Sequence, residues 1–220
     1  MSKKSKMPQI GEAVFCIIYL LFGYIAGSVM LANAHGNEVS IFFGILTLVL
    51  AGGDSFHLVP RIMNAFMNKF EKYEFWAGLG LLVSSVTMTF FYILLIYACM
   101  LNSEFGVVTN QIAYIYYALI VFSVIRIILC LFPQNNWFKK QGNAKWGIIR
   151  NAPFIVVGIL AVIDCFLLGQ IGMGIAIILS FGCYLPVVFL AKKKPMIGML
   201  MIPKTIAYMW IICIALKLVL

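Results

Sequence analysis

Apolar residues run along this chain in seven long stretches, and short polar segments separate each stretch from the next. An α-helix needs about 20 predominantly apolar residues to cross the hydrocarbon core of a bilayer. Each stretch has about that length or more, so we predict seven membrane-spanning helices and an all-α fold. The polar segments are too short to hold a core of their own, so residues 1–220 are predicted to form a single transmembrane domain. The predicted spans cover residues 12–32, 40–67, 75–101, 110–132, 150–169, 171–191 and 196–220.

Composition and charge distribution extend this prediction. The chain is 64% hydrophobic and 10% charged, with a mean hydropathy of +1.04, which is typical of an integral membrane protein. Twelve of its 16 basic residues precede the first span or follow the second, fourth and sixth spans, whereas the segments 33–40, 102–110 and 169–172 contain none. The positive-inside rule then predicts a multi-pass protein of the cell membrane with a cytoplasmic N-terminus and an external C-terminus. The same asymmetry accounts for the net charge of +9, so no nucleic-acid partner is expected.

The cysteine and histidine pattern argues against a metal or another cofactor. All six cysteines fall inside predicted spans, and none forms a C-x-x-C pair. His57 lies within the second span, and the only other histidine, His35, lies in a predicted external loop. A zinc site needs three or four ligands that converge on one point, so this sequence does not predict one.

The second span carries three polar side chains within an otherwise apolar stretch. Asp54, His57 and Arg61 are spaced i, i+3, i+7, which places all three on one face of a helix. A charged side chain near the middle of a bilayer costs roughly 2.5–3.5 kcal/mol, so such residues usually face the bundle interior and have a partner. Gly52 and Gly53 precede Asp54, and Pro60 cannot donate a helical hydrogen bond, so this helix is predicted to kink or open near Asp54.

Three further charges lie within the predicted spans. Counted from the cytoplasmic end, the cations Arg61, Arg126 and Lys204 lie in the first half of the membrane, whereas Asp54 and Asp164 lie near its middle. Arg61 and Arg126 are shallow enough to reach the membrane surface, so anchoring there and binding in the interior both fit the sequence. We predict that Asp54 faces the interior and pairs with at least one of these three cations.

Hydroxyl side chains occur on the third predicted span at a similar depth. In a helix such residues mostly donate to a carbonyl of their own helix, so we expect that most do so and that one or two face the interior. The residues are Ser84, Ser85, Thr87 and Thr89.

The segment around Asp54 resembles a known family. Gly53-Asp54-x-x-x-Leu58-x-Pro60-Arg61 is similar to the G-D-x-x-x-L-x-P-R segment of YhhN-like lysoplasmalogenases. The resemblance covers most of the chain loosely and the ten residues around Asp54 specifically. It implies a multi-span hydrolase that cleaves the vinyl ether bond of a lysoplasmalogen and releases a fatty aldehyde and a glycerophospho-headgroup.

Vinyl ether hydrolysis requires a proton delivered to carbon and then the addition of water. If the resemblance holds, Asp54 is the candidate acid, with Asp164 as a second carboxylate if its helix faces Asp54. His57 is then expected to orient Asp54 or to share its proton. The cations Arg61, Arg126 and Lys204 are candidates for binding the phosphate of a lysophospholipid-like substrate drawn from the membrane lipids.

Two other interpretations remain open. Asp54, His57 and a kinked helix are also typical of a small-solute or proton-coupled transporter with its site near the membrane midplane. The polar cluster would equally fit a non-catalytic membrane protein in which these residues only fix the packing of the helices.

Overall fold

A computed structural model describes residues 7–67, 73–102, 110–138, 142–190 and 194–220, and the regular structure in these residues is helical. Seven of the helices are long and apolar enough to cross a membrane. A 3₁₀ turn, η1 (Pro133–Asn135), follows the fourth of them, and another, η2 (Pro195–Leu200), precedes the last. The seven long helices are α1 (Met7–Ala32), α2 (Glu38–Met67), α3 (Tyr73–Leu101), α4 (Asn110–Leu131), α5 (Ala144–Leu167), α6 (Ile171–Leu190) and α7 (Met201–Val219).

These helices confirm the seven predicted spans, and the largest difference is at the start of α5. This helix begins at Ala144, six residues before the predicted boundary. The side chain of Asn143 accepts hydrogen bonds from the backbone N–H groups of Lys145 and Trp146, so it caps the helix before the fully apolar stretch begins. Pro60 lies inside α2, which continues as a helix through it and does not open into a loop.

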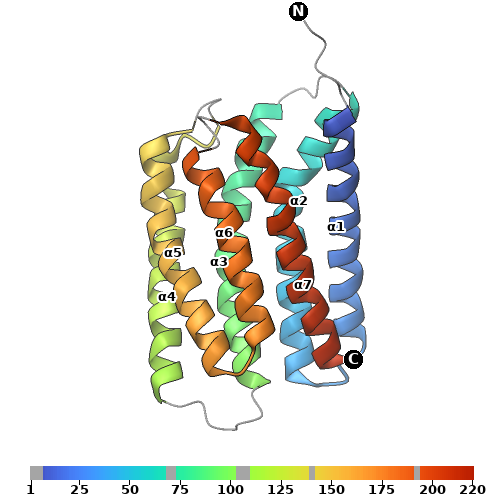
Figure 1. Cartoon of the computed structure of the whole chain (residues 1–220), viewed down its shortest axis with the longest axis vertical. Coiled ribbons are helices and arrows are strands. Elements are labelled where there is room, and N and C mark those ends of the chain that lie inside the picture. Colours follow the sequence, from blue (N-terminus) through green and yellow to red (C-terminus); the bar gives the residue numbers. More distant parts are fainter. Residues whose placement is uncertain (1–6, 68–72, 103–109, 139–141, 191–193) are drawn as a thin grey trace, which may run out of the picture.

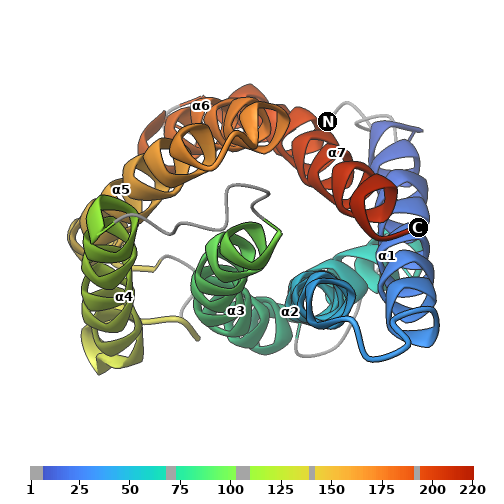
Figure 2. The same ribbon diagram turned by 90° about the horizontal axis from the view of Figure 1, so that it is seen from below.

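The helices form a ring in chain order, and α7 closes the ring against α1 (Figures 1 and 2). Because successive helices alternate in direction, the chain termini lie at opposite ends of the bundle (Figure 1). We refer to these as the N-terminal end, where α1 begins, and the C-terminal end, where α7 ends. Although α3 belongs to the ring, it is displaced toward the middle and also contacts α5 (Figure 2).

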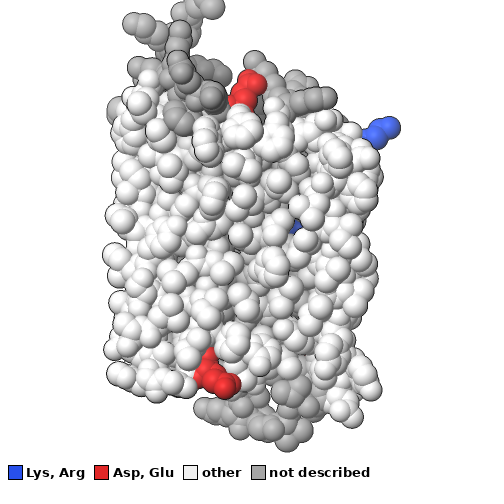
Figure 3. Space-filling view, turned by 180° about the vertical axis from the view of Figure 1, so that it is seen from behind, with Lys and Arg blue, Asp and Glu red and all other residues white. Residues whose placement is uncertain are grey.

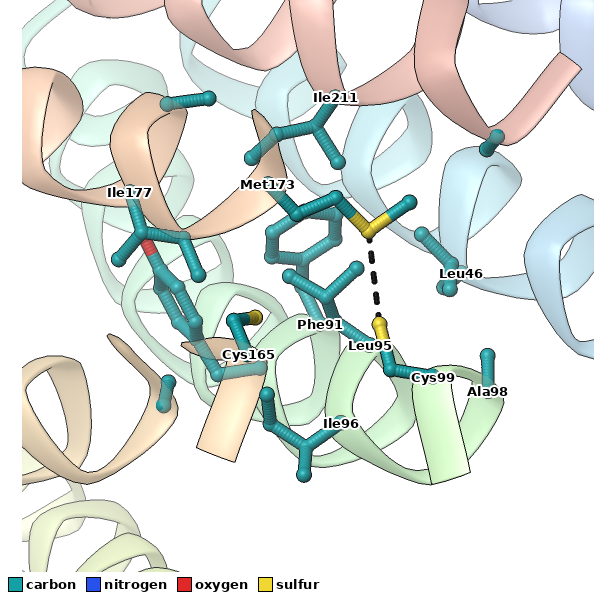
Figure 4. Close-up of a cluster of buried hydrophobic side chains, with 14 of the residues drawn as sticks. Leu46, Phe91, Leu95, Ile96, Ala98, Cys99, Cys165, Met173, Ile177 and Ile211 are labelled. Atoms are coloured by element: carbon teal, nitrogen blue, oxygen red, sulfur yellow. Dashed lines mark hydrogen bonds between the residues drawn. The ribbon is translucent and has the colours of Figure 1, made fainter. Parts of the chain in front are cut away.

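The core lies around α3 in the half of the bundle nearer the C-terminal end. Figure 4 shows side chains from five helices converging there, and all of them are fully buried. The thiol of Cys99 lies 3.4 Å from the sulfur of Met173. The labelled residues are Leu46 on α2, Phe91, Leu95, Ile96, Ala98 and Cys99 on α3, Cys165 on α5, Met173 and Ile177 on α6, and Ile211 on α7.

The outer surface is apolar along the length of the helices. Large side chains such as Ile25, Val121 and Ile159 are exposed at mid-helix positions. In Figure 3 the charged side chains on the visible face lie mainly near its two ends, with a broad uncharged band between them. Such a large apolar surface is unfavourable in water but matches the acyl chains of a bilayer. The fold is therefore that of a multi-pass membrane protein.

Glycines bring α2 and α3 close together at the level of Asp54. A Cβ atom on Gly80 would lie 2.5 Å from the Cα atom of His57, and one on Gly53 would collide with the side chain of Thr87. Small residues at a helix interface let two backbones approach closely, which is the usual means of packing in membranes. This contact fixes Asp54 of α2 against α3.

Candidate functional site

Asp54 is buried between α1, α2 and α3, and two hydroxyl groups hold its carboxyl group. The Tyr19 hydroxyl donates to Oδ2 at 2.8 Å, and the Ser84 hydroxyl donates to Oδ1 at 2.9 Å. Ser84 is the α3 hydroxyl that donates to Asp54, whereas Ser85, Thr87 and Thr89 donate to carbonyl groups of their own helix, and Thr89 does so in the interior. The prediction for these α3 hydroxyls is therefore confirmed.

Asp54 faces the interior as predicted, but the predicted ion pair is absent. Among the residues that the structure describes, no Lys or Arg nitrogen lies within ion-pair distance of Asp54. A hydrogen bond to a charged group contributes about 1.5–3 kcal/mol. The two hydroxyl donors can therefore offset the roughly 2.5–3.5 kcal/mol that the carboxylate costs in the membrane. Formal charges along the sequence do not indicate this arrangement, in which hydroxyl groups rather than a cation hold the carboxylate.

His57 lies beside Asp54 without a hydrogen bond to it. Its Nδ1 atom is 3.8 Å from Asp54 Oδ1, which is too long for a hydrogen bond. Nδ1 is buried and has no hydrogen-bond partner among the described residues. In this geometry a small rotation of either side chain would bring the imidazole and the carboxyl group into contact.

Arg61 belongs to a different cluster, nearer the N-terminal end. Its Nη2 atom lies 2.7 Å from Oε1 of Glu12 on α1, and its side chain is 46% exposed. This pair lines a cavity of about 190 Å³ between α1 and α2 together with Cys16 and Tyr73. Arg61 is thus already neutralised by a carboxylate, and the structure does not bring it together with Arg126.

Arg126 is buried in the interior and does not reach the bundle surface. It is only 2% exposed, and its guanidinium carbon lies 3.2 Å from the centre of the Phe154 ring. Its Nε and Nη1 atoms have no hydrogen-bond partner among the described residues. Of the two interpretations of Arg126, anchoring at the membrane surface is excluded by this burial.

Lys204 points into the same region from α7. Its Nζ atom lies 5.1 Å from the centre of the Tyr184 ring and 5.0 Å from that of Tyr208. Lys204 also interacts electrostatically with both Asp54 and Arg126, so it lies between the carboxyl cluster and the buried arginine. The interior near the N-terminal end therefore holds two cations, Lys204 and Arg126, without a paired carboxylate among the described residues.

Asp164 lies apart from this region. It is three residues before the end of α5, close to the C-terminal end, whereas Asp54 is near the middle of α2. Its electrostatic neighbours are Cys99 and Tyr116, and neither of them interacts with Asp54. The similar depth expected of the two carboxylates is therefore wrong, and they do not form a pair. Asp164 is also fully buried, and both of its oxygens lack a hydrogen-bond partner in the described part of the chain.

Two cavities flank this region. A groove of about 620 Å³ lies near the N-terminal end between α3, α5 and α6, with Tyr184 and Asn151 in its wall and Arg150 and Trp137 among its other lining residues. An open, mostly apolar groove of about 410 Å³ lies where α2 meets α3, beside Phe56, Pro60 and Trp76. None of the main cavities formed by the described residues is lined by Asp54 itself.

Sequence reasoning missed the tyrosines of the interior. Tyr19 holds Asp54, and the hydroxyls of Tyr92 and Tyr208 lie 3.5 Å apart in the centre of the bundle. A signal was present, because tyrosines of membrane helices are enriched at the two interfaces and these three lie well inside their spans. A tyrosine in mid-span indicates a buried partner for its hydroxyl group.

No protein-family model, curated protein or solved structure matches this chain. The geometry therefore has to carry the functional argument. It supplies a buried carboxyl group with hydroxyl donors, an adjacent imidazole and two cations, on α7 and α4, that have no paired carboxylate among the described residues. Such a set can transfer a proton and bind an anion.

Proposed function

We propose that this protein is a membrane-embedded hydrolase of a single-chain lipid, acting on a vinyl ether bond as in lysoplasmalogens. The observation that carries the proposal is the Asp54 carboxyl group, which is buried at membrane depth and held by Tyr19 and Ser84. A hydroxyl group can both donate and accept a hydrogen bond, so this arrangement accommodates the carboxylic acid as well as the carboxylate. The resemblance around Asp54 supports the same function.

In the proposed reaction Asp54 delivers its proton to the alkene carbon farther from the ether oxygen, which leaves an oxocarbenium ion at the carbon attached to that oxygen. Water then adds to the oxocarbenium carbon, and the Asp54 carboxylate accepts the proton that this water releases. The hemiacetal collapses to a fatty aldehyde and the alcohol of the glycerophospho-headgroup. One carboxyl group is enough for this cycle, and His57 serves to orient it or to share its proton. Asp164 has no role in the proposed reaction, because it lies in another part of the bundle.

We propose that the substrate reaches Asp54 from the side of Lys204. Asp54 lines none of the main cavities, and Lys204 of α7 is the cation with which it interacts electrostatically. We therefore expect α2 and α7 to part when substrate enters. The proposed place of the protein is the cell membrane, with its N-terminal end on the cytoplasmic side, because the basic residues precede α1 in the sequence or follow α2, α4 and α6. Labelling of a cysteine introduced at residue 140 from outside intact cells would contradict this orientation.

The test is aldehyde release from a lysoplasmalogen by the purified protein in liposomes. Asp54→Asn keeps the size of the side chain and removes its acidic proton, so we expect activity to fall by a factor of 10² or more. Glu38→Gln, the same chemical change at the first residue of α2, is the matched control and is expected to leave activity unchanged. If the wild-type protein releases no aldehyde above background, the proposal is wrong.

One observation favours the alternative of proton-coupled transport. Asp54, His57 and Lys204 form a buried set of ionisable groups on two helices, without a substrate cavity around Asp54. A transporter would release no aldehyde, but its Asp54→Asn variant would lose proton-dependent uptake into liposomes.

A further inference from the structure

The interior near Arg126 contains several buried hydrogen-bond donors that lack acceptors. Besides Nε and Nη1 of Arg126, the hydroxyl oxygens of Ser123 and Ser180 are buried without a partner at hydrogen-bond distance among the described residues. Ser180 lies beside Tyr92, whose hydroxyl also interacts electrostatically with Arg126. Ser123 lies one turn before Arg126 on α4. A buried polar group without a partner costs free energy, and a buried charge costs considerably more. A set of orphaned donors around a cation indicates that a group rich in acceptors binds there.

The aromatic rings around Arg126 leave part of its guanidinium free for such a group. Phe154 covers one flat face, and this ring in turn packs against Phe181 and Tyr184. Stacking uses the face of a guanidinium and leaves the N–H groups along its edge available for hydrogen bonds. Phe154 therefore holds the side chain in place but satisfies none of its donors.

The second cation contacts the same aromatic cluster, since the Tyr184 ring lies against both Phe154 and Lys204. Lys204 and Arg126 interact electrostatically, and the interaction is repulsive because both carry a positive charge. Among the described residues neither cation is paired with a carboxylate, and Asp54 already accepts two hydrogen bonds elsewhere. An anion bound between Arg126 and Lys204 would neutralise both charges at once. Two positive charges match a dianion best.

We propose that Arg126 and Lys204, with Ser180, form an interior site for a tetrahedral oxyanion of the phosphate class, either inorganic phosphate or the phosphate monoester of a single-chain lipid. The guanidinium edge and the ammonium group supply the charge-assisted hydrogen bonds that phosphate oxygens accept. For the lipid this inference deepens the proposed function and rests on it, whereas binding of inorganic phosphate is independent of hydrolysis.

The groove between α3, α5 and α6 is the route to this site. Tyr184 lines the groove, and its ring also lies against Phe154 and near Lys204, so this side chain borders both the groove and the cation cluster. The Tyr184 hydroxyl donates to Oδ1 of Asn151 at 2.8 Å, and this bond holds the ring in place. Rotation of Tyr184 away from Asn151 opens the way from the N-terminal end of the bundle. A groove of about 620 Å³ is large enough for a headgroup.

The experiment measures the thermal unfolding of the full chain in detergent at constant ionic strength. Inorganic phosphate, lysophosphatidic acid, lysophosphatidylcholine and chloride are titrated separately. We expect phosphate or lysophosphatidic acid to raise the unfolding temperature and chloride to have no effect. Stabilisation by both assigns the site to the phosphate group. Stabilisation by lysophosphatidic acid alone assigns it to a lipid, and stabilisation by phosphate alone assigns it to the free ion. A shift with lysophosphatidylcholine that equals the shift with lysophosphatidic acid contradicts the preference for a dianion.

Three variants locate the site. Arg126→Met and Lys204→Met should each weaken binding at least tenfold, whereas Lys217→Met, at the opposite end of α7, should leave it unchanged. Without added anion Arg126→Met should unfold no earlier than the wild type, because the removed charge has no partner. If no ligand stabilises the wild type, or if stabilisation survives in both Arg126→Met and Lys204→Met, the inference is wrong.

Asp54→Asn separates this inference from the proposed function. Stabilisation by phosphate that persists in this variant, together with a wild type that releases no aldehyde, leaves the anion site standing and removes the hydrolase. If the wild type releases aldehyde and the rate is unchanged in Arg126→Met and Lys204→Met, the hydrolase proposal stands and the anion site at these two residues is wrong.

Discussion

Gly52 and Gly53 are adjacent on α2 but face different surroundings, which allows the packing beside Asp54 to be tested directly. A Cβ atom on Gly53 would lie 2.5 Å from the Cβ atom of Thr87 on α3 and closer still to its Oγ1 atom. A Cβ atom on Gly52 would have the Tyr24 hydroxyl at 3.9 Å as its nearest neighbour. The same substitution to alanine therefore creates a collision at one position and an ordinary contact at the next.

The two substitutions are expected to change the free energy of unfolding in opposite directions. Alanine stabilises the interior of a helix by roughly 0.5–1 kcal/mol relative to glycine, and both variants gain this contribution. Overpacking a close contact costs about 1–3 kcal/mol. Gly53→Ala incurs this cost because the Thr87 Cβ atom is attached directly to the backbone of α3, so the two helices have to separate. We expect Gly52→Ala to be stabilised by about 0.5–1 kcal/mol and Gly53→Ala to be destabilised by about 0.5–2 kcal/mol.

The assay is unfolding of both variants and the wild type in the same detergent, followed by circular dichroism or by retention of the monodisperse peak after heating. Separation of α2 from α3 also lengthens the hydrogen bond from Ser84 to Asp54, so Gly53→Ala should lower aldehyde release as well. Gly53→Ala that is as stable as Gly52→Ala would refute the close approach of the two helices at this level.

Two further predictions concern the buried carboxyl groups. Tyr19→Phe removes one of the two hydroxyl donors to Asp54 and should lower the free energy of unfolding by about 1–3 kcal/mol in chemical denaturation. Tyr24→Phe, the control, loses only an exposed contact with Ser55 and should change it by less than about 0.5 kcal/mol. Equal effects of the two substitutions would contradict the role of Tyr19. Asp164→Asn removes a buried carboxyl group that has no hydrogen-bond partner among the described residues, so thermal unfolding should show unchanged or higher stability. A loss of stability above about 2 kcal/mol would contradict the absence of such a partner.

The seven helices could be predicted from the sequence because one physical quantity determines them. A stretch of about 20 apolar residues has to form a helix in a bilayer, since no water is present there to satisfy its backbone. The start of α5 was missed because the boundary was placed where the polar residues stop. Because Asn143 caps the helix, α5 begins earlier and includes Lys145 and Trp146.

The site could be predicted only in part, because the contacts between helices depend on their rotation and register. The periodicity of α2 correctly turned Asp54 inward. Nothing in the sequence indicated which side chains Asp54 would contact. The prediction that a cation pairs with Asp54 followed from formal charges alone, whereas the actual partners are Tyr19 and Ser84. The same lack of register left open whether Asp164 faces Asp54, and it left two interpretations of Arg126 that burial has now separated.

The arrangement of the interior charges argues against a purely structural role for them. If they served only to fix the packing of the helices, the least costly arrangement would pair each cation with an acid, because an unpaired charge in the membrane costs roughly 2.5–3.5 kcal/mol. The described part of the chain does pair Arg61 with Glu12, and this pair lies where both side chains reach the surface. Deeper in the bundle, where pairing would contribute most, Arg126 and Lys204 lie together and Asp164 lies near the opposite end. A site that receives an anion from outside requires that no carboxylate of the chain pairs with Arg126 or Lys204. Asp54, which interacts with Lys204 beyond ion-pair distance, is instead held by the hydroxyl groups of Tyr19 and Ser84.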